Sequence, residues 1–215
     1  MNGQFSVGPT IGVFRSIEAG IEKFDSIQVV VDTQKDATIF LGIKAEYKVN
    51  SLISIQSELN FMNTSLGAIV YNADEVCAFC PELKTMTVGL MKIDMPILAT
   101  LKIPGPLSKV KLKAGFGTSF NINKTNTYYD LRNRPGVSKI MNGINESIKR
   151  VTYNVNIGFE VNVWRMDVSY RYQSQLSKSL TNDVEYYGKS KPFITASKYH
   201  IFSISYPFYF GEREE

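Results

Sequence analysis

The sequence predicts an all-β fold: an eight-stranded, antiparallel, up-and-down transmembrane β-barrel with short periplasmic turns and four long external loops. Eight segments alternate apolar and polar residues with a period of two, the spacing at which successive side chains of a strand point to opposite faces. Short and long connections alternate strictly between these segments. A content of 12 Tyr, 13 Phe and 15 Gly also favours strands and tight turns over helices.

The first three alternating segments span residues 4–15, 38–49 and 52–62. Their apolar faces carry Phe5, Val7, Ile11 and Val13, then Ile39, Leu41, Ile43 and Tyr47, then Ile53, Ile55, Leu59 and Phe61. The opposite faces are small or polar, and the charged residues on them are Lys44, Glu46, Lys48 and Glu58. Only Asn50-Ser51 lies between the second and third segments, which predicts a tight hairpin.

The fourth and fifth segments, residues 92–103 and 109–121, flank a tight turn at Pro104-Gly105-Pro106. Their apolar faces carry Ile93, Met95, Ile97 and Leu101, then Leu112, Ala114, Phe116 and Phe120. The charged residues on their polar faces are Asp94, Lys102, Lys111 and Lys113. Gly115 and Gly117 also lie on the polar face, where small residues suit a narrow interior.

The last three segments span residues 151–163, 165–175 and 199–210. Residues 151–163 are the most regular, with apolar residues at every odd position. A turn at Val163-Trp164 joins them to the seventh segment, and the polar faces of the pair carry Glu160, Asp167 and Arg171. The eighth segment places His200, Phe202, Ile204, Tyr206, Phe208 and Phe210 on its apolar face.

The whole chain, residues 1–215, is predicted to be one membrane domain. The long connections, residues 16–37, 63–90, 122–150 and 175–197, all fall at one end of the barrel, as in outer-membrane proteins. The strands reach the ~9–11 residues that a tilted strand needs to cross a bilayer, and no apolar run approaches the ~18 residues of a membrane helix. The net charge of +4 is too small and dispersed to indicate a nucleic-acid partner.

A soluble, lipocalin-like barrel is the rival fold, because alternation alone does not say which face is inside. The Gly-, Ser- and Asn-rich polar face, the nearly balanced charges on it, and the aromatic residues near strand ends favour the membrane barrel. The expected location is the bacterial outer membrane. The chain lacks a signal-peptide pattern at residues 1–4 and beyond, so we expect the numbering to describe a processed chain.

Three parts of the sequence resemble the PorT-like outer-membrane barrels of Bacteroidota. They are Met91 to Lys102, with an acidic residue and a proline in the fourth strand, Lys113-Ala114-Gly115-Phe116-Gly117, and a last hairpin with Ile157 to Val161 and Val168 to Tyr172. The pattern extends over essentially the whole chain but contains no catalytic signature. The tail after Phe210 departs from barrels that end on their final aromatic residue. The resemblance implies an eight-stranded, OmpA-like barrel and implies little about activity.

With the polar faces inside, the lumen is expected to hold a charge network of Lys44, Glu46, Lys48, Glu58, Asp94, Lys102, Lys111, Lys113, Glu160, Asp167 and Arg171. Charges in a narrow interior should pair, and eight strands leave only enough room for their own side chains. We therefore predict a plugged barrel. No cofactor or metal site is predicted, since the chain has one His and two Cys.

Catalysis is not predicted either. Small barrel enzymes need a His beside a nucleophile, but His200 and Ser203 are three residues apart on a strand and so face opposite sides. Cys77 and Cys80 are interpreted as a local loop disulfide or as two inactive thiols. Arg132, Arg134, Lys189 and Lys191 lie in long loops beside aromatic residues. They are candidate contacts for lipopolysaccharide or a protein partner, although ordinary solvated loops explain them equally well.

The sequence thus supports a non-enzymatic, monomeric outer-membrane barrel. Its expected partners are outer-membrane lipid, lipopolysaccharide and other envelope proteins. The preferred hypothesis is an anchor or scaffold, or an accessory of a secretion or uptake complex. The alternative is a narrow or gated channel for small solutes, and a lipid-modifying enzyme ranks third.

Overall fold

The computed structural model describes residues 4–16, 19–24, 27–33, 37–72, 84–129, 142–143, 146, 148–177, 183–186, 189–192 and 197–210. Within these ranges only the backbone is described for residues 19–24, 27–33, 66, 68–72, 84–87, 123–129, 183–186 and 189–192. Among the described residues, no helix is long and apolar enough to cross a membrane.

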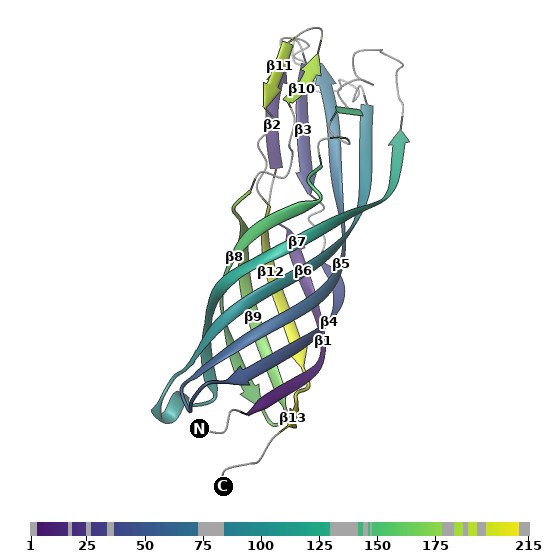
Figure 1. Cartoon of the computed structure of the whole chain (residues 1–215). Helices are drawn as coiled ribbons and strands as arrows, with labels where there is room; N and C mark the ends of the chain where they lie inside the picture. Colours follow the sequence, from purple (N-terminus) through teal and green to yellow (C-terminus); the bar gives the residue numbers. More distant parts are fainter. Residues whose placement is uncertain are drawn as a thin grey trace.

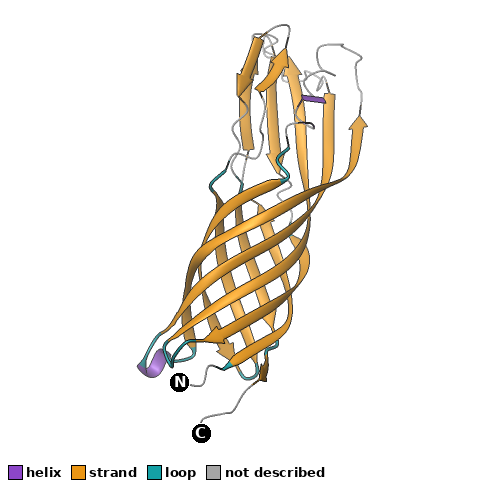
Figure 2. Ribbon diagram, viewed as in Figure 1, coloured by secondary structure: helices purple, strands orange, loops and turns teal. Residues whose placement is uncertain are grey.

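Eight antiparallel strands close into a barrel: β1 (Phe5–Ser16), β4 (Thr38–Lys48), β5 (Ile53–Asn72), β6 (Lys84–Lys102), β7 (Val110–Tyr129), β8 (Val151–Val163), β9 (Met166–Gln175) and β12 (Lys198–Ser205) (Figures 1 and 2). Each pairs with the next, and β12 returns to β1 to complete the ring. A short strand, β13 (Phe208–Phe210), extends this last pairing beyond Pro207, which has no N–H to donate. The predicted fold class is confirmed.

The three short turns lie together at one end of the barrel, beside the start of β1 (Figure 1). In the β4–β5 turn, the side-chain oxygen of Asn50 accepts hydrogen bonds from the backbone N–H groups of Leu52 and Ile53. A 3₁₀ turn, η1 (Gly105–Leu107), joins β6 to β7, and its Gly105 has a φ of 79° that suits glycine. Trp164 adopts a φ of 59° in the two-residue turn between β8 and β9.

At the other end, β5, β6 and β7 continue well past the barrel (Figure 1). A hairpin of β2 (Ala19–Phe24) and β3 (Ile27–Thr33) pairs with β5 from Leu66 to Asn72. We call β2, β3 and these continuations of β5, β6 and β7 the external sheet. A separate hairpin is formed by β10 (Asp183–Tyr186) and β11 (Lys189–Pro192).

The external sheet changes the expected picture of the long loops. Strands occupy parts of residues 16–37, 63–90 and 122–150, so the predicted strand boundaries at residues 62, 92 and 121 were wrong. The reason is physical. Outside a bilayer neither face of a strand must be apolar, so the period-two pattern lapses while backbone pairing continues.

The barrel is apolar on its outside. Outward-facing Ile39, Ile97, Phe116 and Ile157 are each between 62% and 69% exposed, whereas inward-facing Asp94 and Glu160 are fully buried. A soluble protein does not expose a continuous apolar belt of this kind. The lipocalin-like alternative is therefore excluded, because its apolar face would have to line the interior.

Two features let the strands wrap closely. A Cβ atom at Gly115 would overlap the backbone carbonyl of Ile97, so only glycine allows β6 and β7 to approach in this way. Pro96 on β6 cannot donate a ladder hydrogen bond, and the β5–β6 pairing is interrupted between Ser57↔Ile97 and Asn60↔Asp94.

Candidate functional site: the lumenal network

The polar strand faces meet inside the barrel, where they fill it. We call the lumenal network the interlinked charged side chains Lys44, Glu46, Glu58, Asp94, Lys111, Lys113, Glu160, Asp167 and Arg171, which come from the six strands β4 to β9. All are buried except Lys111, which is half-buried. Alternation with period two aims each of them at the lumen, because each shares a face with small or polar neighbours.

Glu160 is the centre of the first part of this network. Its carboxylate lies 3.0 Å from the ammonium of Lys44, 3.2 Å from that of Lys111 and 2.6 Å from that of Lys113. The side-chain amide of Gln56 also donates to it, at 3.2 Å. One buried carboxylate is thus shared by three cations from two separate strands of the wall, β4 and β7.

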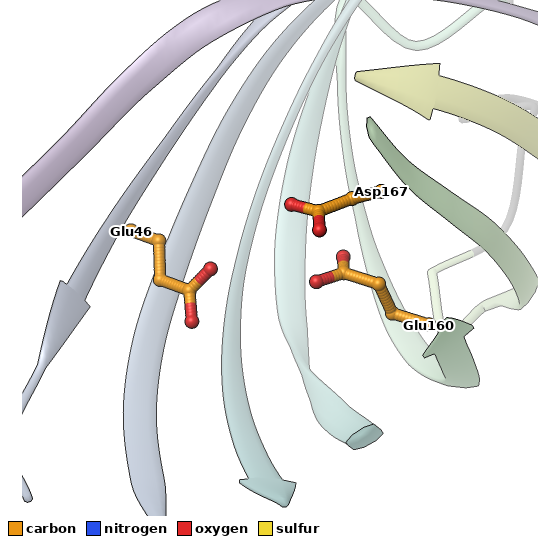
Figure 3. Close-up of side chains that lie close together, drawn as sticks. All are labelled: Glu46, Glu160 and Asp167. Atoms are coloured by element: carbon orange, nitrogen blue, oxygen red, sulfur yellow. The ribbon is translucent and has the colours of Figure 1, made fainter. Parts of the chain in front are cut away.

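Two further carboxylates lie beside Glu160. Figure 3 shows Glu46, Glu160 and Asp167 pointing toward one another, and one oxygen of each lies within 4.8 Å of the others. Asp167 binds Lys44, and Glu46 accepts from Lys111 at 2.7 Å. Three carboxylates at this spacing repel one another unless a cation lies between them. The ammonium groups of the neighbouring lysines provide that positive charge here.

Asp94 is the centre of the second part. Its two oxygens accept from the Arg171 guanidinium at 3.1 Å, from the Ser119 hydroxyl at 2.6 Å and from the Gln173 amide at 3.1 Å. Arg171 also lies 3.4 Å from Glu58, and Lys113 lies 3.9 Å from the same carboxylate. Glu58 therefore joins the two parts into one continuous network.

An apolar layer occupies the lumen toward the external sheet. Phe14, Phe40, Met62, Tyr199 and Ile201 form a buried cluster there, contributed by β1, β4, β5 and β12. The rings of Phe14 and Tyr199 are 6.1 Å apart in an edge-to-face arrangement. The sequence interpretation placed only polar and small residues on these faces, so this layer was missed.

Lys92 was missed as well. It is buried, and its ammonium lies 4.0 Å above the ring of Tyr199, a cation–π contact at the boundary of the apolar layer. Its position, two residues before Asp94 on the same strand face, was the available signal.

Other predicted residues are placed as follows. Lys102 is exposed at the end of β6 and so lies outside the lumenal network, because the strand ends there at the barrel mouth. Lys48 is half-buried at the same mouth and donates to the Gln4 side chain at 2.6 Å.

Four of the predicted loop residues lie outside the described residues: Cys77, Cys80, Arg132 and Arg134. Lys189 and Lys191 are described by their backbone alone, in β11.

His200 and Ser203 face opposite sides of β12, as their spacing requires: Ser203 is buried inside and His200 is partly exposed outside. A hydrogen bond of 2.6 Å joins the Nδ1 atom of His200 to the hydroxyl of Tyr170. The ring of His200 also packs against Tyr172, with centroids 5.4 Å apart. The imidazole is thus held on the outer surface, away from the lumen.

No family model and no curated protein matches the sequence. Among solved structures, the chain is similar to Ail of Yersinia pestis in complex with the heparin analogue sucrose octasulfate, with a TM-score of 0.48, 10% identity, and 97% of this chain and 100% of that one covered. OprG of Pseudomonas aeruginosa matches with a TM-score of 0.40, 12% identity, and 96% of each chain covered. LpxR of Salmonella typhimurium matches with a TM-score of 0.28, 6% identity, and 94% and 99% coverage.

At such identities these likenesses concern the fold alone. The closed eight-stranded ring, the apolar exterior and the buried charges decide the class of the protein. The chain is an outer-membrane β-barrel protein. The resemblance to PorT-like barrels of Bacteroidota has no counterpart in these comparisons and stays a prediction.

Proposed function

We propose that this barrel is plugged and non-enzymatic, and that it anchors the external sheet in the outer membrane as a docking element for another envelope protein. The observation that supports the proposal best is the lumenal network, in which side chains from six consecutive strands meet and pair across the interior. An accessory role in a secretion or uptake complex fits a barrel that supports the external sheet and does not transport a solute.

Opening the lumen would be costly. Separating Arg171 from Asp94, or Lys113 from Glu160, would leave a buried charge without its partner, at about 3–5 kcal/mol for each broken pair. The apolar layer adds a second obstruction toward the external sheet, because water and ions are excluded from closely packed Phe14, Phe40 and Met62. Two layers of different chemistry thus block one path.

The external sheet suits docking because it is continuous with the barrel wall. The ladder of β5 and β6 extends without a loop from Ile53↔Leu101 to Val70↔Lys84, so the sheet has a fixed orientation relative to the membrane. Replacing residues 19–33 with a short Gly-Ser linker should leave the heat-dependent gel shift of the barrel unchanged. The same change should abolish cross-linking to an envelope partner from a photoreactive residue at Thr127 on β7, whereas a probe at Leu52 serves as the short-turn control.

Single-channel recording in planar bilayers tests the plug. We expect no discrete conductance steps from the native chain. The variant D94A/R171A removes both members of a central pair and should produce small steps, while I97A, an outward-facing change, should behave as the native chain does. Reproducible steps from the native chain would overturn the plugged barrel.

A narrow channel is the second candidate, and one observation favours it. The side-chain oxygens of Gln56, Asn60, Asn156 and Gln173 are buried without a protein hydrogen-bond partner. Buried polar atoms of this kind bind water, and a file of water molecules is a path for protons or small solutes. Steps in the native chain that D94A/R171A alters in ion selectivity would favour this function.

A lipid-modifying enzyme stays third. Such chemistry needs a base joined to a nucleophile, and the described hydrogen-bond partner of His200 is the hydroxyl of Tyr170.

A further inference from the structure

The outer surface of the barrel has an unusual distribution of charge. Among the described outward-facing residues of the eight barrel strands, the only charged side chains are Arg15 on β1 and Lys198 on β12, and no acidic residue occurs. The chain's single histidine, His200, also faces outward, on β12. A random placement of two cations and one histidine would scatter them around eight strands.

Instead they lie together. Arg15 and His200 are directly opposite each other in the β1–β12 ladder, and Tyr172 is directly opposite His200 in the β12–β9 ladder. Neighbouring strands are ~4.8 Å apart, so these three side chains form one row about 10 Å wide. Lys198 follows two residues from His200 on the same face, ~7 Å further along the strand.

The row lies at the edge of the apolar belt on the side of the external sheet. Below it on the same three strands, the outward residues are Val13, Phe202 and Tyr170, and then Ile11, Ile204 and Val168. Above it comes Lys198, opposite Ser174. The surface therefore changes from apolar to cationic within two residues along the strand. A change of this kind is expected at the level of the lipid headgroups.

The aromatic neighbours fix the imidazole in this position. Tyr170 holds its Nδ1 atom through a hydrogen bond of 2.6 Å, while the rings of Tyr170 and Tyr172 pack against it at centroid distances of 5.9 and 5.4 Å. Tyr170 is supported in turn by Phe202, 4.9 Å away. Such a platform at the membrane boundary presents a polar imidazole edge beside two cations with little loss of side-chain entropy.

We propose that Arg15, Lys198 and His200, with Tyr172, form a binding site for the phosphate group of a lipid in the outer leaflet. Arg15 and Lys198 would supply the positive charge that attracts the phosphate, and the acyl chains would lie on the apolar belt below. The site rests on the barrel's place in the membrane and is independent of whether the lumen is plugged. It also differs from the long-loop residues considered above as lipopolysaccharide contacts.

Native mass spectrometry of the detergent-folded chain tests the site, with diphosphoryl lipid A as the probe. Its dephosphorylated form and phosphatidylcholine are the lipid controls, and millimolar inorganic phosphate is the competitor. The variant R15Q/K198Q should bind diphosphoryl lipid A about tenfold more weakly. The variant K109Q/R165Q removes the same charge from two exposed residues at the short-turn end and should bind as the native chain does.

The conservative variant R15K/K198R retains both charges and should keep most of the affinity, which separates a charge effect from a folding effect. A heat-dependent gel shift verifies that each variant is folded. Equal weakening in R15Q/K198Q and K109Q/R165Q would overturn the proposal, as would equal binding of phosphorylated and dephosphorylated lipid. Full displacement of lipid A by inorganic phosphate would also overturn it, because the site would then recognise a free anion. Conductance is measured in a separate experiment. Its outcome decides the proposal of a plugged barrel and does not affect the proposal of this lipid site.

Discussion

Replacing Glu160 with Gln tests the lumenal network most directly, since it removes the charge that three lysines share while preserving the shape of the side chain. Lys44 keeps Asp167 and Lys111 keeps Glu46. Lys113 retains only Glu58 at 3.9 Å and the Ser169 hydroxyl at 3.3 Å. The loss therefore falls mainly on one buried ammonium, and we expect E160Q to lower the free energy of unfolding by about 3 kcal/mol, the low end for a broken buried pair.

The double variant E160Q/K113M should recover most of this loss, to within about 1–2 kcal/mol of the native chain, because the unpaired cation is removed too. Urea unfolding in phospholipid vesicles, followed by far-UV circular dichroism and by the gel shift, measures both. E146Q, at an exposed residue outside the barrel wall, is the matched control and should change nothing. A loss below 1 kcal/mol in E160Q, or a double variant E160Q/K113M no more stable than E160Q, would refute the shared-carboxylate reasoning.

Two further predictions concern the barrel wall. G115V should prevent folding or sharply reduce the gel-shifted fraction, because its Cβ would overlap the Ile97 carbonyl, whereas the adjacent outward-facing change A114V should fold normally. In vesicles, a cysteine at Ile97 should resist a membrane-impermeant maleimide, while one at Trp164, 92% exposed in the short turn, should react. Rapid labelling at position 97 would mean that the apolar belt is not covered by lipid.

The barrel itself was predictable because the membrane imposes strict chemistry on each wall-forming residue. Outward positions such as Ile97 must suit lipid, and many inward positions such as Asp94 suit a polar interior, so the alternation is clear in each barrel strand. The charged residues of the lumenal network could be named for the same reason, although buried Lys92 was missed. Their partners could not, because the pairing of Lys113 with Glu160 depends on barrel tilt and stagger.

The failures are equally physical. Phe14 and Phe40 share a strand face with small and polar residues, and only the closed barrel shows that this face reaches an apolar layer near the external end. Residues 63–72 lost their alternation where lipid no longer constrained them, although their backbone continued to pair. The alternation of apolar and polar residues indicates whether each side chain faces lipid or the polar interior. Backbone hydrogen bonds between strands form without such alternation.

The extension of the β5–β6 ladder beyond the barrel has a mechanical consequence. A partner pulling on the external sheet along its strands would load many backbone hydrogen bonds at once, in shear, rather than peeling them one by one from a flexible loop. Force would then pass straight into the barrel wall and from there into the surrounding lipid. With the proposed partner bound, the strand extension would act as a rigid tether between that partner and the membrane.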